Sequence, residues 1–172
     1  ILVAGNETTG AAMAQGVLLL IENPDQYQLI LDNPSPQTIS NFVEEVLRVS
    51  SPSANMYRRT TQDVELHGVN IPKNSICFAR FASANQDDHQ FQDALRFDIT
   101  RDNLKSHVAF GKGVHHCLGA ALARREMNIG FKVLFERVEN FRLHSNNESP
   151  EFMPNALLHG LEKLDIAFDI RR

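Results

Sequence analysis

Cysteine is scarce in this chain of 172 residues, which contains only Cys77 and Cys117. Two cysteines cannot build a disulfide framework, so a reducing cytoplasm is the simplest expected location. Cys77 lies in an apolar, strand-like run between Ile76 and Phe78, which predicts a small buried hydrophobic side chain. Cys117 is therefore the cysteine for which a chemical role has to be sought.

A basic excess, a long apolar run and a linker are also missing. The net charge of −4 argues against a nucleic-acid-binding protein, which usually carries a clear positive charge. The longest apolar run, residues 16–21, is far shorter than the ~18 residues that can span a bilayer. No internal repeat, low-complexity tract or Pro/Gly/Ser-rich stretch divides the chain. We therefore expect one globular domain with a sizeable core over residues 1–172.

Hydrophobic periodicity predicts a mainly helical α+β fold. Helical patterns of apolar positions cover residues 1–22, 25–31, 37–49 and 118–138. The third pattern carries a stripe that we expect to be buried, formed by Phe42, Val43, Val46 and Leu47. Shorter runs predict strands at 56–61, 64–66, 69–71, 75–82 and 141–144, and a final hairpin of 157–160 with 164–170. Residues 84–107 show no clear periodicity, and a stretch of that length usually forms a functional or ligand-supported loop.

The densest group of chemically active residues is Phe110-Gly-Lys-Gly-Val-His115-His116-Cys117-Leu-Gly119, called the cysteine loop below (residues 110–119). Its alternating glycines allow the backbone to fold tightly and to approach a flat ligand closely. Cys117 falls at or just before a helix N-terminus, where the helix dipole and free N–H groups stabilise a thiolate. Such a thiolate is a metal ligand or a nucleophile, and the alternative is a buried structural cysteine.

Two further patterns are ambiguous by themselves. The stretch Ala4-Gly5-Asn6-Glu7-Thr8-Thr9-Gly10 is polar and a weak helix former, and its threonines can bond back to a carbonyl. It suits either a ligand contact or a helix crossing packed on small residues. Glu45 and Arg48 share a helix face, and taken alone they predict an ordinary exposed ion pair.

Taken together and in order, these motifs resemble the C-terminal part of a cytochrome P-450, a haem-thiolate monooxygenase, of the soluble bacterial type. Phe110-Gly-x-Gly-x-His115-x-Cys117-x-Gly119 matches the haem loop of the family, and Ala4-Gly5-x-Glu7-Thr8-Thr9 matches its oxygen-activating helix. Glu45-x-x-Arg48 matches its Glu-x-x-Arg pair, and Arg58 matches an arginine that binds a haem propionate. The resemblance covers essentially the whole chain.

The full chain of that family is more than twice as long, so the resemblance implies that an N-terminal half is absent here. The N-terminus agrees with this expectation, because it opens in helical sequence without an initiator methionine, a signal peptide or a cap. The implied fold is the C-terminal portion of the P-450 fold, with a long central helix, the haem loop and small sheets. Asn74 stands where a turn glycine is usual, but asparagine tolerates a positive φ.

The resemblance implies haem b as the cofactor, with Cys117 as the axial ligand of the haem iron. Loop N–H groups are expected to bond the sulfur, and Phe110 to shield it. Gly111, Gly113 and Gly119 would allow the backbone to come close to the haem. Donors for the propionates would be His115 and Arg58. His116 is expected to be structural or exposed.

On the opposite haem face, the resemblance assigns catalysis to Thr8, which would hydrogen-bond the dioxygen, and to Glu7, which would relay protons. Gly5 and Ala4 would let the helix open beside the cofactor. Glu45 and Arg48 would form a buried triad with Arg96, which precedes Phe97, and Arg101 is the second choice for the third member. Buried charges must be paired with one another, and a triad satisfies that requirement.

Substrate and partner contacts follow from the same resemblance. The substrate would be a nonpolar organic molecule that is hydroxylated or epoxidised. Its candidate contacts are Leu2, Val3, Ser53, Ala54, Asn55, Met56 and Leu157. Ordinary core packing is the alternative role for these residues. Electrons would come from NAD(P)H through an acidic donor of the ferredoxin or flavodoxin type, which would dock on Lys112, Arg124 and Arg125. A solvated helix face is the alternative for those three residues.

Three other functions remain as alternatives. One is a non-catalytic haem-binding or gas-sensing module, which would have no need of a proton-delivery pair such as Glu7 and Thr8. Another is an inactive fragment of a monooxygenase. The third is a zinc site, for which the adjacent residues His115, His116 and Cys117, with His107, offer poor spacing for tetrahedral ligation.

Overall fold

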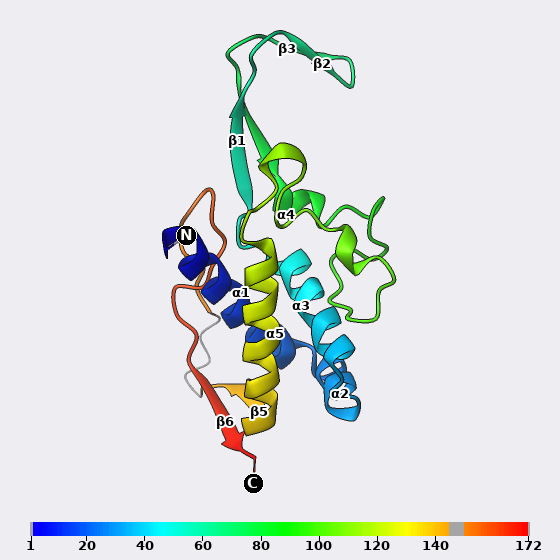
Figure 1. Cartoon of the computed structure of the whole chain (residues 1–172), viewed down its shortest axis with the longest axis vertical. Coiled ribbons are helices and arrows are strands. Elements are labelled where there is room, and N and C mark those ends of the chain that lie inside the picture. Colours follow the sequence, from blue (N-terminus) through cyan, green and yellow to red (C-terminus); the bar gives the residue numbers. More distant parts are fainter. Residues whose placement is uncertain (1, 145–149, 172) are drawn as a thin grey trace.

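The computed structural model describes residues 2–144 and 150–171. Its helical body contains α1 (Leu2–Glu22), α2 (Pro24–Asp32), α3 (Pro36–Ser50) and α5 (Ala120–Arg137), as Figure 1 shows. Shorter helical turns are α4 (Phe81–Ala84), η1 (Leu104–Ser106) and η2 (Gly113–His115). The strands of the described residues form two-stranded antiparallel sheets, and no described helix is long and apolar enough to cross a membrane. The predicted helix-dominated α+β fold is confirmed.

Local sequence explains where the long helices begin and end. Pro24 and Pro36 occupy the first turns of α2 and α3, where the missing N–H costs no hydrogen bond. Ser35 caps α3, because its Oγ accepts the N–H of Thr38 at 3.1 Å. Ser51 ends α3 in the left-handed region with a φ of 40°. The predicted bounds of these helices are therefore correct to within one residue.

The core lies where α1, α3 and α5 pack together. The stripe predicted on α3 is confirmed, because Phe42, Val43, Val46 and Leu47 are at most 3% exposed. The ring of Phe42 meets Phe131 of α5 edge to face, with 4.7 Å between the ring centroids. Because α3 is enclosed in this way, polar side chains that follow its stripe are carried into the interior as well.

A two-stranded ribbon projects from the helical body (Figure 1). It consists of β1 (Asn55–Arg59) and β4 (Ile76–Arg80), and its tip is β2 (Val64–Leu66) paired with β3 (Val69–Ile71). Its turns use the expected residues, since Gly68 has a φ of 77° and Asn74 a φ of 69°. The prediction that Cys77 is buried is wrong: it is half-buried on β4, because a two-stranded ribbon cannot enclose both of its faces.

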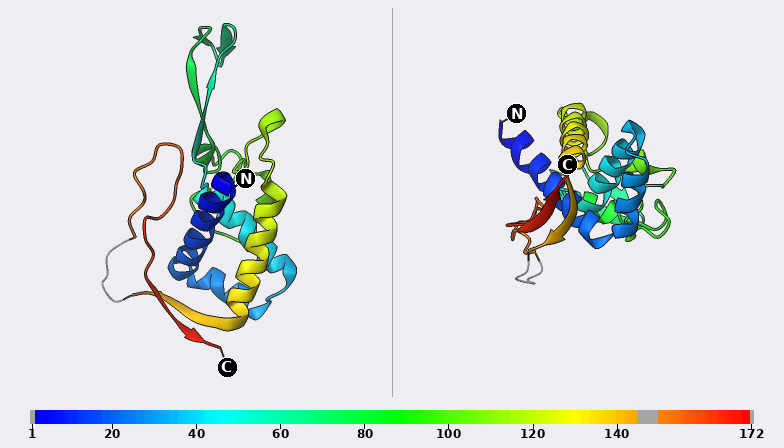
Figure 2. Two further views of the ribbon diagram at one scale, coloured as in Figure 1. Left: turned by 60° about the vertical axis from the view of Figure 1, so that its left-hand side comes forward. Right: turned by 90° about the horizontal axis from the view of Figure 1, so that it is seen from below.

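The last sheet differs from the predicted C-terminal hairpin. Strand β6 (Ile166–Ile170) pairs with β5 (Val138–Leu143), which directly follows α5, and Figure 2 shows the pair below the helical body. The predicted pairing of 157–160 with 164–170 is wrong, since Leu158 instead forms a bridge with Ser53. A cross-strand ion pair of Arg142 with Asp169, 3.2 Å apart, accompanies this pairing. Helix α5 also starts two residues later than predicted, because Leu118 and Gly119 still belong to the loop.

Two glycines of α1 should respond in opposite ways to alanine. A Cβ at Gly16 would lie 2.6 Å from Phe131 Cζ and 3.3 Å from Val46 Cγ2, whereas a Cβ at Gly10 meets nothing within 4 Å. Gly16→Ala should therefore overpack the core and lower the free energy of unfolding by about 1–3 kcal/mol. Gly10→Ala should raise the free energy of unfolding by about 0.5–1 kcal/mol, because alanine favours the helix more than glycine does. Thermal unfolding of the two variants checks this, and a stabilising Gly16→Ala would contradict the packing of α1 on α5.

Candidate functional site

The cysteine loop is a closed turn just ahead of α5. The N–H of Cys117 donates to the carbonyl of Phe110 at 2.9 Å, which closes the loop across its base. Gly111 and Gly113 have φ values of 69° and 75°, in the left-handed region that glycine adopts without strain. The N–H of Ala120, the first residue of α5, donates to the carbonyl of Cys117 at 3.3 Å. The predicted position of the cysteine, just before a helix N-terminus, is confirmed.

The thiol of Cys117 is exposed, and its neighbours on the loop are exposed apolar side chains. Val114 is 99% exposed and Leu118 is 96% exposed, which is unusual for aliphatic residues. Among the described residues no hydrogen bond to Cys117 Sγ is formed, and the N–H of Cys117 itself donates to the carbonyl of Phe110. A Cβ at Gly119 would lie 3.8 Å from Cys117 Sγ, an ordinary contact within the chain, and the expected close approach of Gly119 to haem stays a prediction. A free thiol flanked by bare aliphatic groups fits a flat apolar ligand such as haem.

A cavity of about 380 Å³ adjoins the loop and brings together two basic residues predicted to act together. It is lined by Arg58 and His115, with Tyr57, Arg59 and Ile76. Arg58 comes from β1 and His115 from the cysteine loop, so folding joins parts of the chain that are far apart in sequence. The cationic or donor groups of Arg58, Arg59 and His115, beside the apolar surface of Tyr57 and Ile76, suit the carboxylates of an amphiphilic ligand. The residues present therefore fit the propionate side of a haem.

Glu45 and Arg48 form a fully buried ion pair on α3. Arg48 Nε lies 2.7 Å from Glu45 Oε2, and Arg48 Nη2 lies 2.8 Å from Glu45 Oε1, so the pair is bidentate. The exposed pair expected from spacing alone is wrong, and the buried network expected from the resemblance is present. Its third member is Arg101, whose Nε donates to Glu45 Oε1 at 3.1 Å.

The assignment of Arg96 to this triad is therefore wrong. Arg96 contributes its backbone carbonyl, which accepts from Arg48 Nη2 at 3.0 Å and from Arg101 Nη2 at 2.7 Å. Its own side chain is exposed. Both arginines lie in a stretch without periodicity, so sequence could not tell which of them turns inward.

Arg48 also organises the irregular residues 85–101, called the coil segment below. Its Nη1 donates to the carbonyls of Asn85 and Ala94, each at 2.7 Å. The guanidinium lies 5.0 Å above the ring of Phe91. Asn85 in turn accepts the N–H of Val108 at 2.7 Å through its side-chain oxygen. One buried side chain thus sets the path of the coil segment up to the residues that enter the cysteine loop.

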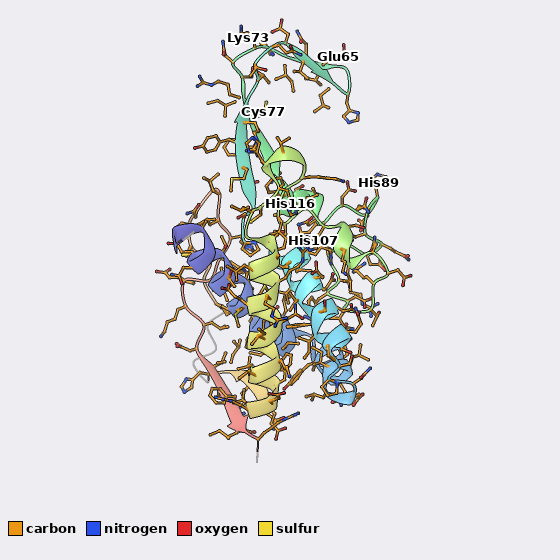
Figure 3. All side chains as sticks on the ribbon, in the orientation of Figure 1. Glu65, Lys73, Cys77, His89, His107 and His116 are labelled. Carbon is orange, nitrogen blue, oxygen red and sulfur yellow. The ribbon has the colours of Figure 1, made fainter. Side chains whose placement is uncertain are left out.

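A second buried cluster was missed in the sequence and centres on Glu44. Glu44 Oε2 lies 3.0 Å from His107 Nε2, and Glu44 Oε1 accepts from Arg124 Nε at 2.6 Å. Burial alone would raise the pKa of Glu44, but hydrogen bonds from His107 and Arg124 outweigh it and lower the pKa from 4.5 to about 2. Figure 3 shows His107 near the upper ends of α3 and α5. The only signal in the sequence for a functional role of Glu44 was its position beside Glu45 on α3.

Arg124 is paired with Glu44 but is not buried. Besides its bond to Glu44, its guanidinium stacks 4.5 Å above the ring of Phe110, and its side chain remains 32% exposed. The expectation that Arg124 faces a partner together with Lys112 and Arg125 stays a prediction. Lys112 and Arg125 are exposed, as that expectation requires.

The N-terminal part of α1 has the expected threonine geometry. Thr8 Oγ1 donates to the carbonyl of Ala4 at 2.7 Å, which confirms the predicted back-bond. Thr8 is half-buried and Glu7 is exposed, and both line a pocket of about 10 Å³ together with His159. A space of that size holds about one water molecule. Helices α1 and α5 begin at the same end of the helical body, so Thr8 and the cysteine loop share this end (Figures 1 and 2).

The two segments predicted to contact a substrate lie side by side. Asn55 Nδ2 donates to the carbonyl of Ala156 at 2.8 Å, and its N–H to the carbonyl of Leu157 at 3.3 Å. The half-buried candidates are Ser53, Ala54, Asn55 and Leu157, whereas Met56 is 36% exposed. The side chains of Leu2 and Val3 lie outside the described part of the structure. Ala4 and Gly5 are exposed on the first turns of α1.

A zinc site is not supported by the arrangement of the histidines. Within residues 2–144 and 150–171, no group of three or more His, Cys, Asp or Glu side chains could hold a metal ion. His107 is occupied at both nitrogens, because Nε2 bonds Glu44 and Nδ1 accepts the N–H of Ala109 at 3.2 Å. His116 is exposed, as expected, with its ring 6.4 Å from that of Phe110.

Comparison with known proteins gives consistent matches over nearly the whole chain. The family model described as cytochrome P450 matches residues 37–166. Cytochrome P450 107B1 of Saccharopolyspora erythraea is 40% identical over 167 residues, which are 96% of this chain and 40% of the relative. The 6-deoxyerythronolide B hydroxylase of the same organism is 35% identical over 169 residues, which are 98% of this chain and 41% of the relative.

Solved structures agree with the sequence matches. Cytochrome P450 CYP109Q5 from Chondromyces apiculatus superposes with a TM-score of 0.91 at 34% identity, over 99% of this chain and 43% of the other. This chain spans about 40% of the length of the curated relatives that it matches.

Single alanine substitutions of Arg101 and Arg96 should have different effects on the stability of the protein. Arg101→Ala removes a charged bond to buried Glu45 and the bonds to three carbonyls, those of Gln92, Asp93 and Arg96. Arg101→Ala should lower the free energy of unfolding by about 1.5–3 kcal/mol. Arg96→Ala keeps the carbonyl that Arg96 contributes, so it should change stability by about 0.5 kcal/mol or less. Urea unfolding measures both, and equal losses would contradict the assignment of Arg101.

Proposed function

The chain belongs to the cytochrome P450 family, and from this premise we propose that it supplies the haem-binding, thiolate side of a monooxygenase. The reaction is the hydroxylation or epoxidation of a nonpolar organic molecule. Haem bound through a thiolate supplies an iron centre whose electron-rich sulfur ligand favours cleavage of the O–O bond of dioxygen. The residues of this chain bind that group, exclude water from it and move protons toward it.

The observation that carries the proposal is the exposed thiol of Cys117 on a closed glycine loop. Val114 and Leu118 beside it offer aliphatic surface to the macrocycle. Arg58 and His115, which line one cavity, offer positive charge and donors to its propionates. The left-handed Gly111 and Gly113 keep side chains away from the space that the ligand enters. These features supply an axial ligand, an apolar contact and a carboxylate site, which are the needs of haem b.

Proton delivery is assigned to Thr8 and Glu7 on the opposite side of the site. Thr8 Oγ1 donates to the carbonyl of Ala4 here, and in the haem-loaded protein Thr8 would hydrogen-bond dioxygen while Glu7 would relay protons. Glu7 is exposed, so its carboxyl group is in contact with solvent. A gas sensor would not need this pair, and its presence therefore favours the monooxygenase.

Substrate contacts are proposed for the adjoining segments at residues 53–56 and 156–158. Their hydrogen-bonded backbones hold Ser53, Ala54, Asn55, Met56 and Leu157 as one surface of small and apolar groups. Such a surface suits a nonpolar molecule. One relative is the linalool 8-monooxygenase of Pseudomonas putida, whose name describes oxidation of an organic compound by that protein.

Electrons are proposed to come from NAD(P)H through a ferredoxin- or flavodoxin-type protein in the cytoplasm. Lys112 on the cysteine loop and Arg125 on α5 are exposed cations next to the ligand cysteine. An acidic donor would be steered to them by charge complementarity. Arg124 remains a candidate for the same surface, because its side chain is 32% exposed even though its charge is paired with Glu44.

Cys117→Ser tests ligation directly. In the haem-loaded protein, reduction and addition of CO should give the strongly red-shifted Soret band of a thiolate-ligated haem, and the variant should lose it. His116→Ala, a change in the exposed neighbour, should retain the band. Absorption spectroscopy measures both. A band that survives Cys117→Ser, or a wild-type protein that takes up no haem, would defeat the proposal.

Thr8→Ala tests proton delivery. Loss of the hydroxyl should lower product formation by about 10²-fold, while the CO spectrum stays that of the wild type. Thr8→Ser, which keeps the hydroxyl, should recover most of the turnover. Product formation per NAD(P)H consumed is the measurement. Equal turnover in Thr8→Ala and wild type would favour a role other than proton transfer.

Charge reversal tests the docking surface. Lys112→Glu and Arg125→Glu together should slow reduction by an acidic ferredoxin about tenfold at low salt, because steering is lost. The difference should shrink at high salt. Stopped-flow reduction measures the rates, and salt-independent or unchanged rates would rule this face out.

A further inference from the structure

The Glu44 cluster is not used by the function described above, and it reaches the cysteine loop from the side of the core. We propose that Glu44, His107 and Arg124 are positioning residues that hold the loop so that Cys117 remains the haem ligand. This inference rests on the proposed haem-thiolate function. It assigns a second support to the loop, separate from the Glu45–Arg48–Arg101 network.

The first step of the argument is that Glu44 is a fixed anchor. Its side chain is 3% exposed, and it extends from α3 next to fully buried Glu45. Both carboxylate oxygens are occupied: Oε1 by Arg124 Nε at 2.6 Å, and Oε2 by Arg124 Nη2 at 2.9 Å and His107 Nε2 at 3.0 Å. A bidentate arginine and a histidine leave the carboxylate little freedom to turn.

The second step is that the histidine has one defined tautomer. His107 Nδ1 accepts the backbone N–H of Ala109 at 3.2 Å, so the ring proton is on Nε2. Nε2 therefore donates to Glu44. This pairing ties the backbone at residues 107–109, which leads into the cysteine loop, to the carboxylate on α3.

The third step connects Arg124 to the cysteine. The guanidinium stacks 4.5 Å above the Phe110 ring, and the carbonyl of Phe110 accepts the N–H of Cys117 at 2.9 Å. The contacts thus run from Glu44 through Arg124 and Phe110 to Cys117 without a gap. The ring of His107 lies on the same Phe110, with 6.1 Å between centroids. Phe110 is therefore held by both partners of Glu44.

The fourth step separates this cluster from the general stability of the fold. Glu45 fixes the coil segment through Arg48, Arg101 and the N–H of Asp98. None of these bonds includes Arg124 or His107. Loss of the Glu44 contacts should consequently loosen the loop while the coil segment keeps its anchor.

Two adjacent arginines of α5 provide a matched pair of variants. Arg124→Gln removes the bidentate bond and the stacking on Phe110, whereas Arg125→Gln removes an equal charge from an exposed position. In the haem-loaded protein, the thiolate-type CO band should decay about tenfold faster in Arg124→Gln, the size typical of lost outer contacts at a metal site. Arg125→Gln should decay at the wild-type rate within about twofold, since no contact to the loop is lost.

Backbone hydrogen exchange provides a readout that does not depend on turnover. The amide of Cys117, which is bonded to Phe110, should exchange about tenfold faster in Arg124→Gln than in Arg125→Gln. Arg124→Lys should fall between them, because lysine keeps the charge but loses the bidentate and stacked geometry. Ile30→Val, in the α2 part of the core, should lower the melting temperature without changing the band decay or this exchange.

The possible results distinguish this inference from the proposed function. If the wild type shows no thiolate-type band, the haem-thiolate function fails and the inference falls with it. If the wild type shows the band but Arg124→Gln and Arg125→Gln behave alike, the positioning role alone is overturned. Should Arg124→Gln fail to fold, His107→Gln and Arg124→Lys carry the same comparison, and wild-type band decay and exchange in both would overturn the inference.

Discussion

The buried charge of Arg48 is the constraint on which much of this structure depends. A guanidinium removed from water is costly unless each of its donors finds a partner. Here Glu45 supplies two oxygens, and the carbonyls of Asn85, Ala94 and Arg96 supply the remainder. Those carbonyls belong to a segment with little regular structure, so satisfying Arg48 also defines the path of that segment. The requirement to pair one buried cation thus replaces the hydrogen-bond ladder that a helix or strand would have provided.

Two neighbouring glutamates on α3 share the task of supporting the site. Glu45 faces the coil segment, and Glu44 faces the residues that enter the cysteine loop and the first turns of α5. Both side chains are buried because they lie on a helix enclosed by α1 and α5. The low pKa of Glu44, about 2, follows from its two basic partners despite its burial. Glu44 therefore remains negatively charged, and each of the two carboxylates orients a different part of the chain.

The surface that this support presents is open and largely apolar. Val114 and Leu118 extend from the cysteine loop, and the cavity with Arg58 and His115 lies next to it. Membership of the cytochrome P450 family gives this combination a chemical meaning, because a flat apolar cofactor with two carboxylates and a metal needs such contacts. Two adjacent arginines on α5 have different surroundings, because successive residues of a helix point in different directions. Arg124 faces Glu44 and Phe110, whereas Arg125, one residue further round the helix, faces solvent.

Features that depend on neighbouring residues and on short spacings follow from the amino-acid sequence. The helices, the stripe on α3, the back-bond of Thr8 and the glycine turn before α5 were all predictable, because propensity, capping and periodicity act over a few positions. Tertiary structure alone decided that Arg101 rather than Arg96 completes the triad and that Glu44 binds His107 and Arg124. It also decided that β6 pairs with β5 and that Cys77 stays half-buried. These outcomes depend on contacts between segments that are far apart in the sequence. Such contacts are decided by the packing of the whole chain and by the pairing of its buried charges.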